Sequence, residues 1–302
     1  MARKKAPRKK KGKKASYWWI VPLLLLMASL VATLYFVFLR PGTFDRKAKP
    51  HPEARGAKPP VAYEEPHLPP TIVALPYKKR EDTGLVQAAI IIDDMGYKEQ
   101  IGRDLIRLDL NLSFAFLPSG PHIATLTEMA HNRGHDILLH LPMEPKDSRW
   151  QPGPGALFSS MTEREIASNL EKNIKAIPFA IGVNNHMGSR FTADPRSMKI
   201  CLLLLKKKHL FFLDSVTAAD SVAYRTAEDV GLPSARRDVF LDHDTNPAAI
   251  AKQFDLFIGI AKKNGSAIGI GHPHPETLAV LREYADILRK EVKLVGVSRL
   301  VR

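Results

Sequence analysis

Residues after Gly84 alternate between short apolar runs and longer amphipathic segments, and this alternation constrains the fold more than any other feature. The longer segments carry helix signals, including Thr162 and Glu165 in capping-box spacing and prolines at first helical positions. The apolar runs have the length and composition of buried strands. We predict strands at residues 86–94, 112–117, 136–140, 180–185, 210–214, 238–242, 267–271 and 293–297.

Seven or eight β/α units in about 220 residues predict an α/β fold, namely a (β/α) barrel that is complete or slightly open. A doubly wound open sheet is the alternative. The barrel domain is predicted at residues 85–302. The single cysteine, Cys201, lies in an apolar run of this domain, so the chain cannot form an internal disulfide.

Polar side chains stand at the ends of six of the predicted strands. The first strand ends in two adjacent carboxylates, Asp93 and Asp94, although like charges repel. In a (β/α) barrel the carboxyl ends of the strands meet at one rim, where barrel enzymes keep their active sites. The other strand ends carry His140, Asn185 and His186, Asp214, Asp242, and His272.

A set of Asp and His side chains without thiolates suits zinc, or another divalent first-row metal, better than calcium. Such a cation would lower the pKa of a bound water and polarise a carbonyl group. A carboxylate outside the ligand set could take the water's proton, and a histidine across the site could protonate the leaving group. The alternative is that these strand-end groups only satisfy one another.

The N-terminal segment predicts a membrane anchor. Residues 17–39 hold no charged side chain and would span about 35 Å as a helix, enough to cross a bilayer. Residues 1–14 hold nine Lys or Arg and no acid, so the basic tail, residues 1–16, is expected to stay in the cytoplasm. The domain would then lie in the periplasm or outside the cell. A cleaved signal peptide is the alternative, but its apolar region would be only about 7–15 residues long.

A proline-rich, charged segment follows the predicted anchor, and we interpret residues 40–84 as a linker. Residues 1–14 and 40–80 together account for the entire net charge of +14. Residues 81–302 are therefore neutral overall, and we expect no nucleic-acid-binding face on the domain.

Five segments of the chain together resemble the divergent polysaccharide deacetylases, a branch of the carbohydrate esterase deacetylases. These segments are IIIDDMG, RGHDILLHLPMEP, NNHMGSRF, FFLDSVT and GIGHPHPET, within roughly residues 86–301. The resemblance implies a distorted barrel of about seven units and a divalent metal, usually zinc. It also implies that Asp93 is the general base, Asp94 a metal ligand and His272 a catalytic histidine.

The second motif departs from the pattern of the better-known deacetylases. Its lead-in, GHDI, is present and its first histidine ligand falls on His140, but Glu144 stands where those enzymes carry the second histidine. The third ligand is therefore expected to be either Glu144 or His186. The arginine motif is not cleanly present, although Arg190 lies near the corresponding place. The residues expected to contact substrate are Asn185, Arg190, Asp214 and Asp242.

The resemblance implies a metal-dependent hydrolase that removes N- or O-acetyl groups from an envelope polysaccharide or peptidoglycan, and the predicted anchor would attach it to the membrane. It would act on C–N bonds other than peptide bonds, or on ester bonds. One alternative is a non-catalytic envelope protein that binds glycan or a protein partner through the same rim. A metal phosphoesterase is a third hypothesis, since related barrels also use Asp and His sites.

Overall fold

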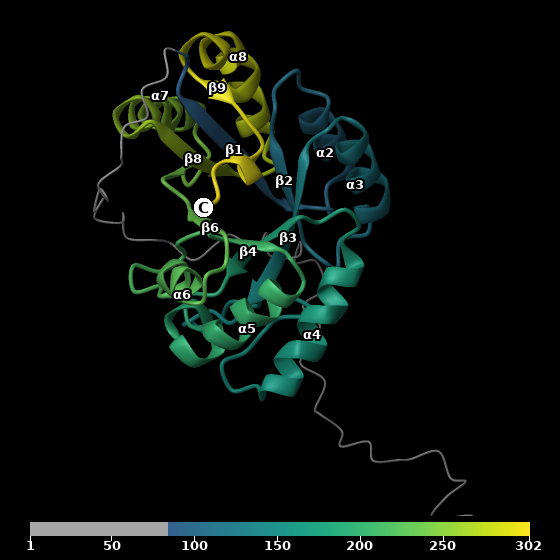
Figure 1. Ribbon diagram of the computed structural model, residues 1–302. Helices are drawn as coiled ribbons and strands as arrows, with labels where there is room; N and C mark the ends of the chain where they lie inside the picture. The colour runs from purple at the N-terminus through teal and green to yellow at the C-terminus, as the bar shows by residue number, and fades with distance from the viewer. Residues whose placement is uncertain (1–83) are drawn as a thin grey trace, which may run out of the picture. The chain divides into compact units, whose positions relative to one another are not determined.

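The structure is a computed structural model that describes residues 84–302 (Figure 1). The predicted tail at 1–16, the predicted anchor at 17–39 and all but the last residue of the predicted linker lie outside the described residues. Within residues 84–302, no helix is both long enough and apolar enough to cross a membrane.

Strands and helices alternate through most of the described domain, as the sequence predicts, but two short strands follow one another without a helix within residues 234–240. The strands are β1 (Gln87–Met95), β2 (Ser113–Phe116), β3 (Asp136–Met143), β4 (Gly182–Met187), β5 (Phe211–Asp214), β6 (Ser234–Arg236), β7 (Val239–Phe240), β8 (Ser266–Gly271) and β9 (Lys293–Leu294). The α-helices are α2 (Glu99–Ile106), α3 (Ile123–Asn132), α4 (Glu163–Ala176), α5 (Pro195–Lys207), α6 (Ala223–Asp229), α7 (Pro247–Asn264) and α8 (Pro275–Glu291), with 3-10 turns η2 (Phe191–Ala193) and η3 (Val297–Arg299).

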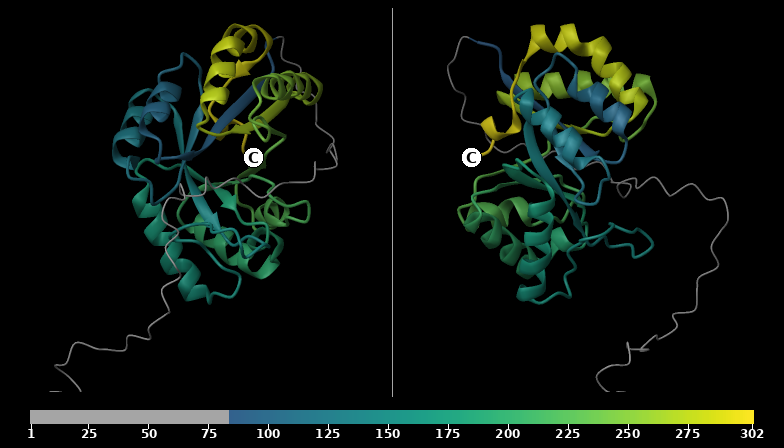
Figure 2. Two further views of the ribbon diagram at one scale, coloured as in Figure 1. Left: turned by 180° about the vertical axis from the view of Figure 1, so that it is seen from behind. Right: turned by 90° about the vertical axis from the view of Figure 1, so that its right-hand side faces the viewer.

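The helices begin where the sequence signals place them. Thr162 caps α4 by accepting a hydrogen bond from the backbone N–H of Glu165, and the Glu165 carboxylate accepts one from the backbone N–H of Thr162. Asp194 caps α5, and a proline occupies its first turn. In Figures 1 and 2 the helices lie around the periphery of the strands.

The strands form one parallel sheet that curls on itself. Its order is β6-β5-β4-β3-β2-β1-β8-β7, with β9 added beside β1. The end strands β6 and β7 are joined by only Arg237 and Asp238, so the two ends of the sheet must lie close together. The Arg237 N–H donates to the Asp214 carbonyl and the Asp238 N–H to the Ile268 carbonyl, both at 2.9 Å. The predicted α/β architecture is therefore confirmed as a curled parallel sheet with peripheral helices, consistent with a (β/α) barrel.

Two predicted strands are much shorter than expected. Of residues 238–242, only Val239 and Phe240 form a strand. Of residues 293–297, only Lys293 and Leu294 form a strand. Val297, at the start of η3, packs in a small apolar cluster with side chains of the sheet. This cluster is the inner core, and it also contains Ala89 and Ile91. Ile90 and Ile92 belong instead to the larger core between sheet and helices.

The two-residue period of the strands explains why polar side chains enter the barrel. Ala89 and Ile91 face inward, so Asp93 faces inward as well; Leu138 is followed in the same way by His140. Asn184 and His186 share one face of β4, and His272 follows the inward Ile268 and Ile270 of β8. The inner face is thus apolar along most of its length and polar at the carboxyl ends of the strands.

Candidate active site

Three side chains from β1, β3 and β4 converge on one point. The Asp94 Oδ1 atom lies 3.3 Å from His140 Nε2 and 3.0 Å from His186 Nδ1. The two imidazole nitrogens are 3.1 Å apart. Asp94, His140 and His186 form one of the two groups in the described part of the chain whose ligand atoms could jointly hold a metal ion.

Adjacent residues of a strand normally face opposite ways, yet both Asp93 and Asp94 contact this site. The register of β1 against β2 shifts between Ile92 and Met95, and Asp94 has a left-handed backbone with φ of 53°. Such a bulge inserts a residue and redirects its side chain. The bulge therefore turns Asp94 toward the rim while Asp93 keeps its inward position.

The burial and partners of the two aspartates give them opposite pKa shifts. Burial raises the pKa of Asp93, and the attraction of His140 and His272 only partly opposes this effect. Burial would also raise the pKa of Asp94, but its contacts with His186 and His140 outweigh burial and hold that pKa well below its usual value. Asp94 is therefore the anionic member suited to a cation, and Asp93 the more basic carboxylate.

Asn184 links Asp93 to His140, a role that the sequence did not predict. Its amide nitrogen donates to both carboxylate oxygens of Asp93, at 2.8 and 3.0 Å. Its amide oxygen lies 2.9 Å from His140 Nδ1, so that nitrogen carries the proton and donates. In a neutral imidazole the Nε2 lone pair then faces Asp94 and His186. The signal was the alternation of β4, which puts Asn184 on the same face as His186.

A second pair, Asp242 and His272, lies at the ends of β7 and β8. His272 Nδ1 is 2.8 Å from Asp242 Oδ1, and Thr277 donates to Asp242 Oδ2 at 2.7 Å. Burial would raise the pKa of Asp242, but the attraction and hydrogen bonds of His272 outweigh burial and lower it. The Phe240 ring stacks on the imidazole of His272, with centroids 5.4 Å apart and planes inclined by 12°.

These contacts favour a positioning role for Asp242 over the substrate contact that the sequence predicts, because both of its oxygens are bound within the protein. Asp242, His272 and His274 also form the second group of side chains that could hold a metal ion. His274 is the N-cap residue of α8, and its side chain makes no capping hydrogen bond.

Glu144 stands apart from the group of Asp94, His140 and His186. Its Oε2 atom accepts hydrogen bonds from the backbone N–H and the hydroxyl of Ser159, at 2.8 and 2.6 Å. Its Oε1 atom lies 3.7 Å from Arg190 Nε. Of the two alternatives for the third ligand, the structure brings His186, not Glu144, together with Asp94 and His140.

Asn185 and Asp214 are buried and bonded to loops at the rim. Asn185 donates to the Met187 carbonyl at 2.8 Å and accepts from the Ser215 N–H at 2.9 Å. Asp214 accepts from the Val216 N–H and the Ser221 hydroxyl, each at 2.8 Å. These bonds brace the ends of β4 and β5, and the contact of either residue with substrate stays a prediction.

The geometry of Asp94, His140 and His186 fits a divalent cation. Ligands about 2.0–2.1 Å from a tetrahedral zinc ion are roughly 3.3–3.4 Å from one another, and the three ligand atoms here are 3.0–3.3 Å apart. Asp94 Oδ1 is buried and has no hydrogen-bond partner among the described residues. A cation would satisfy this oxygen, and the carboxylate–imidazole donor set is one that zinc accepts.

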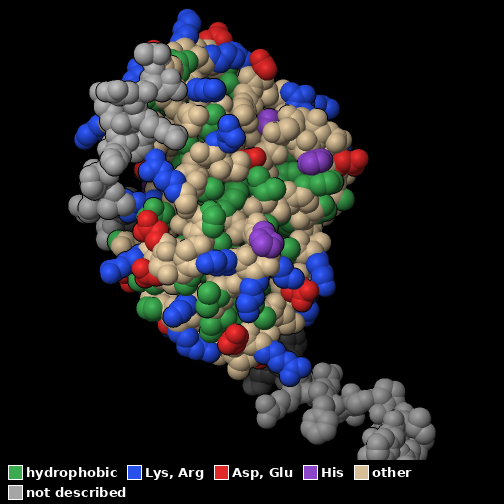
Figure 3. Space-filling view, viewed as in Figure 1, with side chains coloured by type: hydrophobic (Ala, Val, Ile, Leu, Met, Phe, Trp, Pro, Cys, Tyr) green, Lys and Arg blue, Asp and Glu red, His purple; other side chains and the backbone are tan. Residues whose placement is uncertain are grey.

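The face of the domain that Figure 3 shows carries charges of both signs. Figure 3 shows Lys and Arg side chains interspersed with Asp and Glu over the face in view. This distribution agrees with the balanced charge of residues 81–302.

The chain is similar to known proteins over most of its described part. The family model described as divergent polysaccharide deacetylase matches residues 90–301. The protein YibQ of Escherichia coli K12, described as uncharacterized, is 38% identical over 213 residues, which are 70% of this chain and 66% of that protein. An uncharacterized protein of Haemophilus influenzae is 39% identical over 214 residues, which are 71% of this chain and 76% of that protein.

A crystal structure shows the same fold. It is that of an uncharacterized protein of Agrobacterium tumefaciens C58, with 27% sequence identity and a TM-score of 0.70. The similarity covers 74% of this chain and 93% of that one.

Proposed function

This chain belongs to the divergent polysaccharide deacetylase family, and from this premise we propose that its barrel domain is a metal-dependent hydrolase. It would remove acetyl groups from an envelope polysaccharide or peptidoglycan. The observation that carries the proposal is the convergence of Asp94, His140 and His186 beside a basic carboxylate, Asp93.

Asp94, His140 and His186 would hold the cation, for which we propose Zn²⁺, and when bound it would polarise the acetyl carbonyl and acidify a water molecule. Asn184 supports this arrangement because it fixes the proton of His140 on Nδ1. It thereby leaves Nε2 as the ligand atom. Partners of this kind orient metal-binding histidines in many proteins.

Asp93 would take the proton from the attacking water. Burial raises the pKa of Asp93, which makes its carboxylate a stronger base than an exposed aspartate. Asn184 donates to both Asp93 oxygens and so holds the carboxylate plane in one orientation.

His272 would protonate the departing nitrogen or oxygen of the sugar. The His272 Nδ1–H donates a hydrogen bond to the Asp242 carboxylate, which leaves Nε2 as the atom that can deliver a proton. One proton is taken from water and one is given to the leaving group, so water adds across the acyl bond. The products are acetate and a free amine or hydroxyl group.

We also propose that residues 17–39 anchor the protein in the cytoplasmic membrane as a single pass, with the N-terminus inside. The support is the uncharged span behind nine basic residues. The domain would then meet its polysaccharide in the periplasm or at the cell surface.

The test is metal analysis of the purified full-length protein together with acetate release from acetylated peptidoglycan and chitin oligomers. We expect about one zinc ion per chain and acetate release that a chelator abolishes. An Asp94→Ala variant serves as the control and should lose both metal and activity. If the protein retains these glycans and metal but releases no acetate, the hydrolase proposal is wrong and a binding role replaces it.

A further inference from the structure

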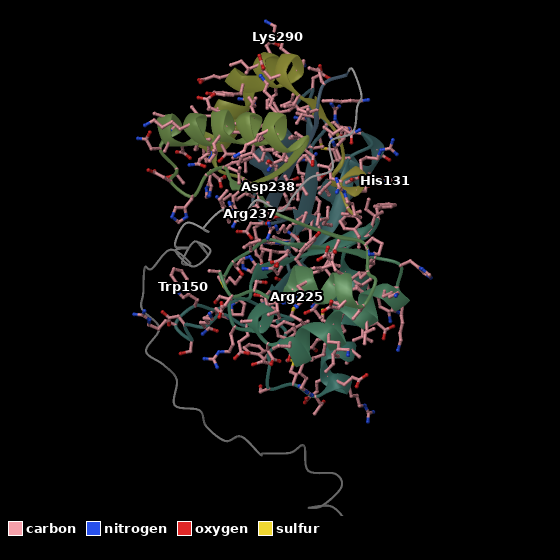
Figure 4. The ribbon with its side chains drawn as sticks, turned by 60° about the vertical axis from the view of Figure 1, so that its left-hand side comes forward. His131, Trp150, Arg225, Arg237, Asp238 and Lys290 are labelled. Carbon is pink, nitrogen blue, oxygen red and sulfur yellow. The ribbon has the colours of Figure 1, made fainter. Side chains whose placement is uncertain are left out.

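The two-residue connection between β6 and β7 carries a buried cation. The Arg237 side chain is only 6% exposed. Its Nε atom donates to the Ser215 carbonyl at 2.7 Å and its Nη2 atom to the Val216 carbonyl at 3.0 Å. Figure 4 shows Arg237 beside Asp238, where the chain passes from one end of the curled sheet to the other.

The turn at Ser215 and Val216, whose carbonyls accept from Arg237, has an unfavourable backbone conformation. Val216 has a φ of 51°, and β-branched residues rarely adopt the left-handed region. The turn places the Ser215 hydroxyl 3.2 Å from the amide nitrogen of Asn184, which in turn donates to Asp93. Arg237 therefore supports the turn that contacts Asn184, on the side of the site that contains the base.

Arg237 also reaches the side of the site that contains the acid. Its Cζ atom lies 4.4 Å from the centroid of the Phe240 ring, within cation–π range. The same Phe240 ring stacks on His272. One guanidinium thus contacts the neighbours of both proposed proton-transfer groups.

We propose that Arg237 is a positioning residue that fixes the Asp93 side of the site relative to the His272 side. A planar guanidinium presents its donors in a rigid fork, so it can donate to two successive carbonyls while its flat face lies over an aromatic ring. An ammonium group is a compact point charge on a flexible chain and does not reproduce this planar geometry. The inference rests on the proposed function for its catalytic consequence, but the geometric coupling can be measured without turnover.

The experiment uses the full-length protein with ¹³C,¹⁵N-labelled histidines and follows the ring signals of His140 and His272 by NMR. His140 reports on Asn184, to which it is bonded, and His272 reports on Phe240. Arg237→Lys should shift or broaden both ring signals. Arg236→Lys is the matched control, because Arg236 is only partly buried and its Cζ atom lies over the ring of Tyr224, 5.9 Å from the centroid.

Two further variants test the two contacts of Arg237 separately, the one with the turn at Ser215 and the one with Phe240. Ser215→Ala removes the hydroxyl next to Asn184 and should move the His140 signal while sparing His272. Phe240→Leu removes the stacked ring and should do the reverse. These two variants keep the inference testable if an Arg237 variant does not fold. If Ser215→Ala leaves the His140 signal unchanged and Phe240→Leu leaves the His272 signal unchanged, the inference is overturned.

Activity supplies a second measurement. Arg237→Lys should lower kcat on acetylated chitin oligomers by on the order of 10²-fold with KM and zinc content nearly unchanged, because displaced groups slow the chemical step. The inference fails if Arg237→Lys leaves both histidine signals and kcat as in the Arg236→Lys control. If the unmodified protein releases no acetate, the deacetylase proposal fails, while the NMR comparison still decides whether Arg237 couples the two sides.

Discussion

The side-chain amide nitrogen of Asn184 donates hydrogen bonds to both carboxylate oxygens of Asp93, at 2.8 and 3.0 Å. Both residues are fully buried. The Asn184 side chain also accepts from His140, so one amide fixes a proposed base and a proposed metal ligand. Because an amide has one donor end and one acceptor end, neither a carboxylate nor an alkyl group can replace it.

Asn184→Asp should therefore weaken zinc binding by about 10- to 100-fold. The new carboxylate would face Asp93 and repel it, and the tilted His140 ring would present Nε2 poorly. Zinc affinity can be measured by competition with a chromogenic chelator. Asn185→Ala is the neighbouring control and should leave the affinity unchanged, because Asn185 bonds to loops at the rim. Equal affinities for all three proteins would contradict this role of Asn184.

Single substitutions should identify the metal ligands. Asp94→Ala, His140→Ala and His186→Ala should each lower zinc occupancy, because few ligands share the binding free energy. Glu144→Gln should keep its zinc, since Glu144 bonds to Ser159 outside the ligand group. Elemental analysis of the purified variants measures the occupancy. Full occupancy in both Asp94→Ala and His140→Ala would show that the proposed site is wrong.

Asp93→Asn should separate the base from the ligands. The substitution preserves shape and leaves Asp94, His140 and His186 intact, so the zinc content should stay at the level of the unmodified protein. Loss of a general base typically lowers the rate by on the order of 10²–10⁴-fold. Acetate release and metal content measured on the same sample test both statements. Metal loss in this variant would make Asp93 a ligand instead of the base.

The sequence predicts much of this site because strands have a two-residue period and parallel strands end at one rim. Asp93, His186 and His272 lie at or near the carboxyl ends of their strands for that reason, and His140 lies in the carboxyl half of β3, which continues to Met143. The period also distinguishes Asn184 from Asn185, once the inward face of β4 is known. Which face is inward depends on pairing with β3 and β5, and that information is not local.

Other features depend on long-range structure that no local pattern reports. The bulge that turns Asp94 toward the rim arises where the pairing of β1 with β2 shifts. The motif spacing made Glu144 a candidate ligand, but the loop after β3 bonds its carboxylate to Ser159. Arg237 drew no functional interpretation because its partners, Ser215 and Phe240, come from opposite ends of the curled sheet.

A reporter fused after Arg302 should test the proposed topology. Nine basic residues before an uncharged span of 23 residues should hold the N-terminus in the cytoplasm. Alkaline phosphatase, which matures outside the cytoplasm, should then be active in the fusion, and a cytoplasmic reporter should be inactive. The reverse pattern would overturn both the topology and the localisation. A fusion that lacks residues 1–39 serves as the control, since it should remain in the cytoplasm.

Asp242→Asn should lower the stability of the folded protein at neutral pH. Asp242 is almost completely buried, and both of its oxygens accept hydrogen bonds, from His272 and from Thr277. Hydrogen bonds to a charged group contribute about 1.5–3 kcal/mol each to the free energy of unfolding. Scanning calorimetry should therefore show a melting temperature several degrees lower for the variant. Asp109→Asn is the control, because the Asp109 side chain is 97% exposed.

The pH dependence of this difference has a definite sign. The folded pKa of Asp242 lies below its ordinary value of 3.8, since its contacts with His272 outweigh the effect of burial. A carboxyl group with a lowered folded pKa contributes stability that is fully present above the unfolded pKa and is lost as the pH falls through the folded pKa. The difference in melting temperature should thus not fall between about pH 8 and 5 and should shrink only below about pH 4. A difference that grows as the pH falls below about 5, where histidine side chains are already protonated, would mean that Asp242 is held as the neutral acid. The Asp242–His272 pair would then have the opposite charge distribution from the one proposed.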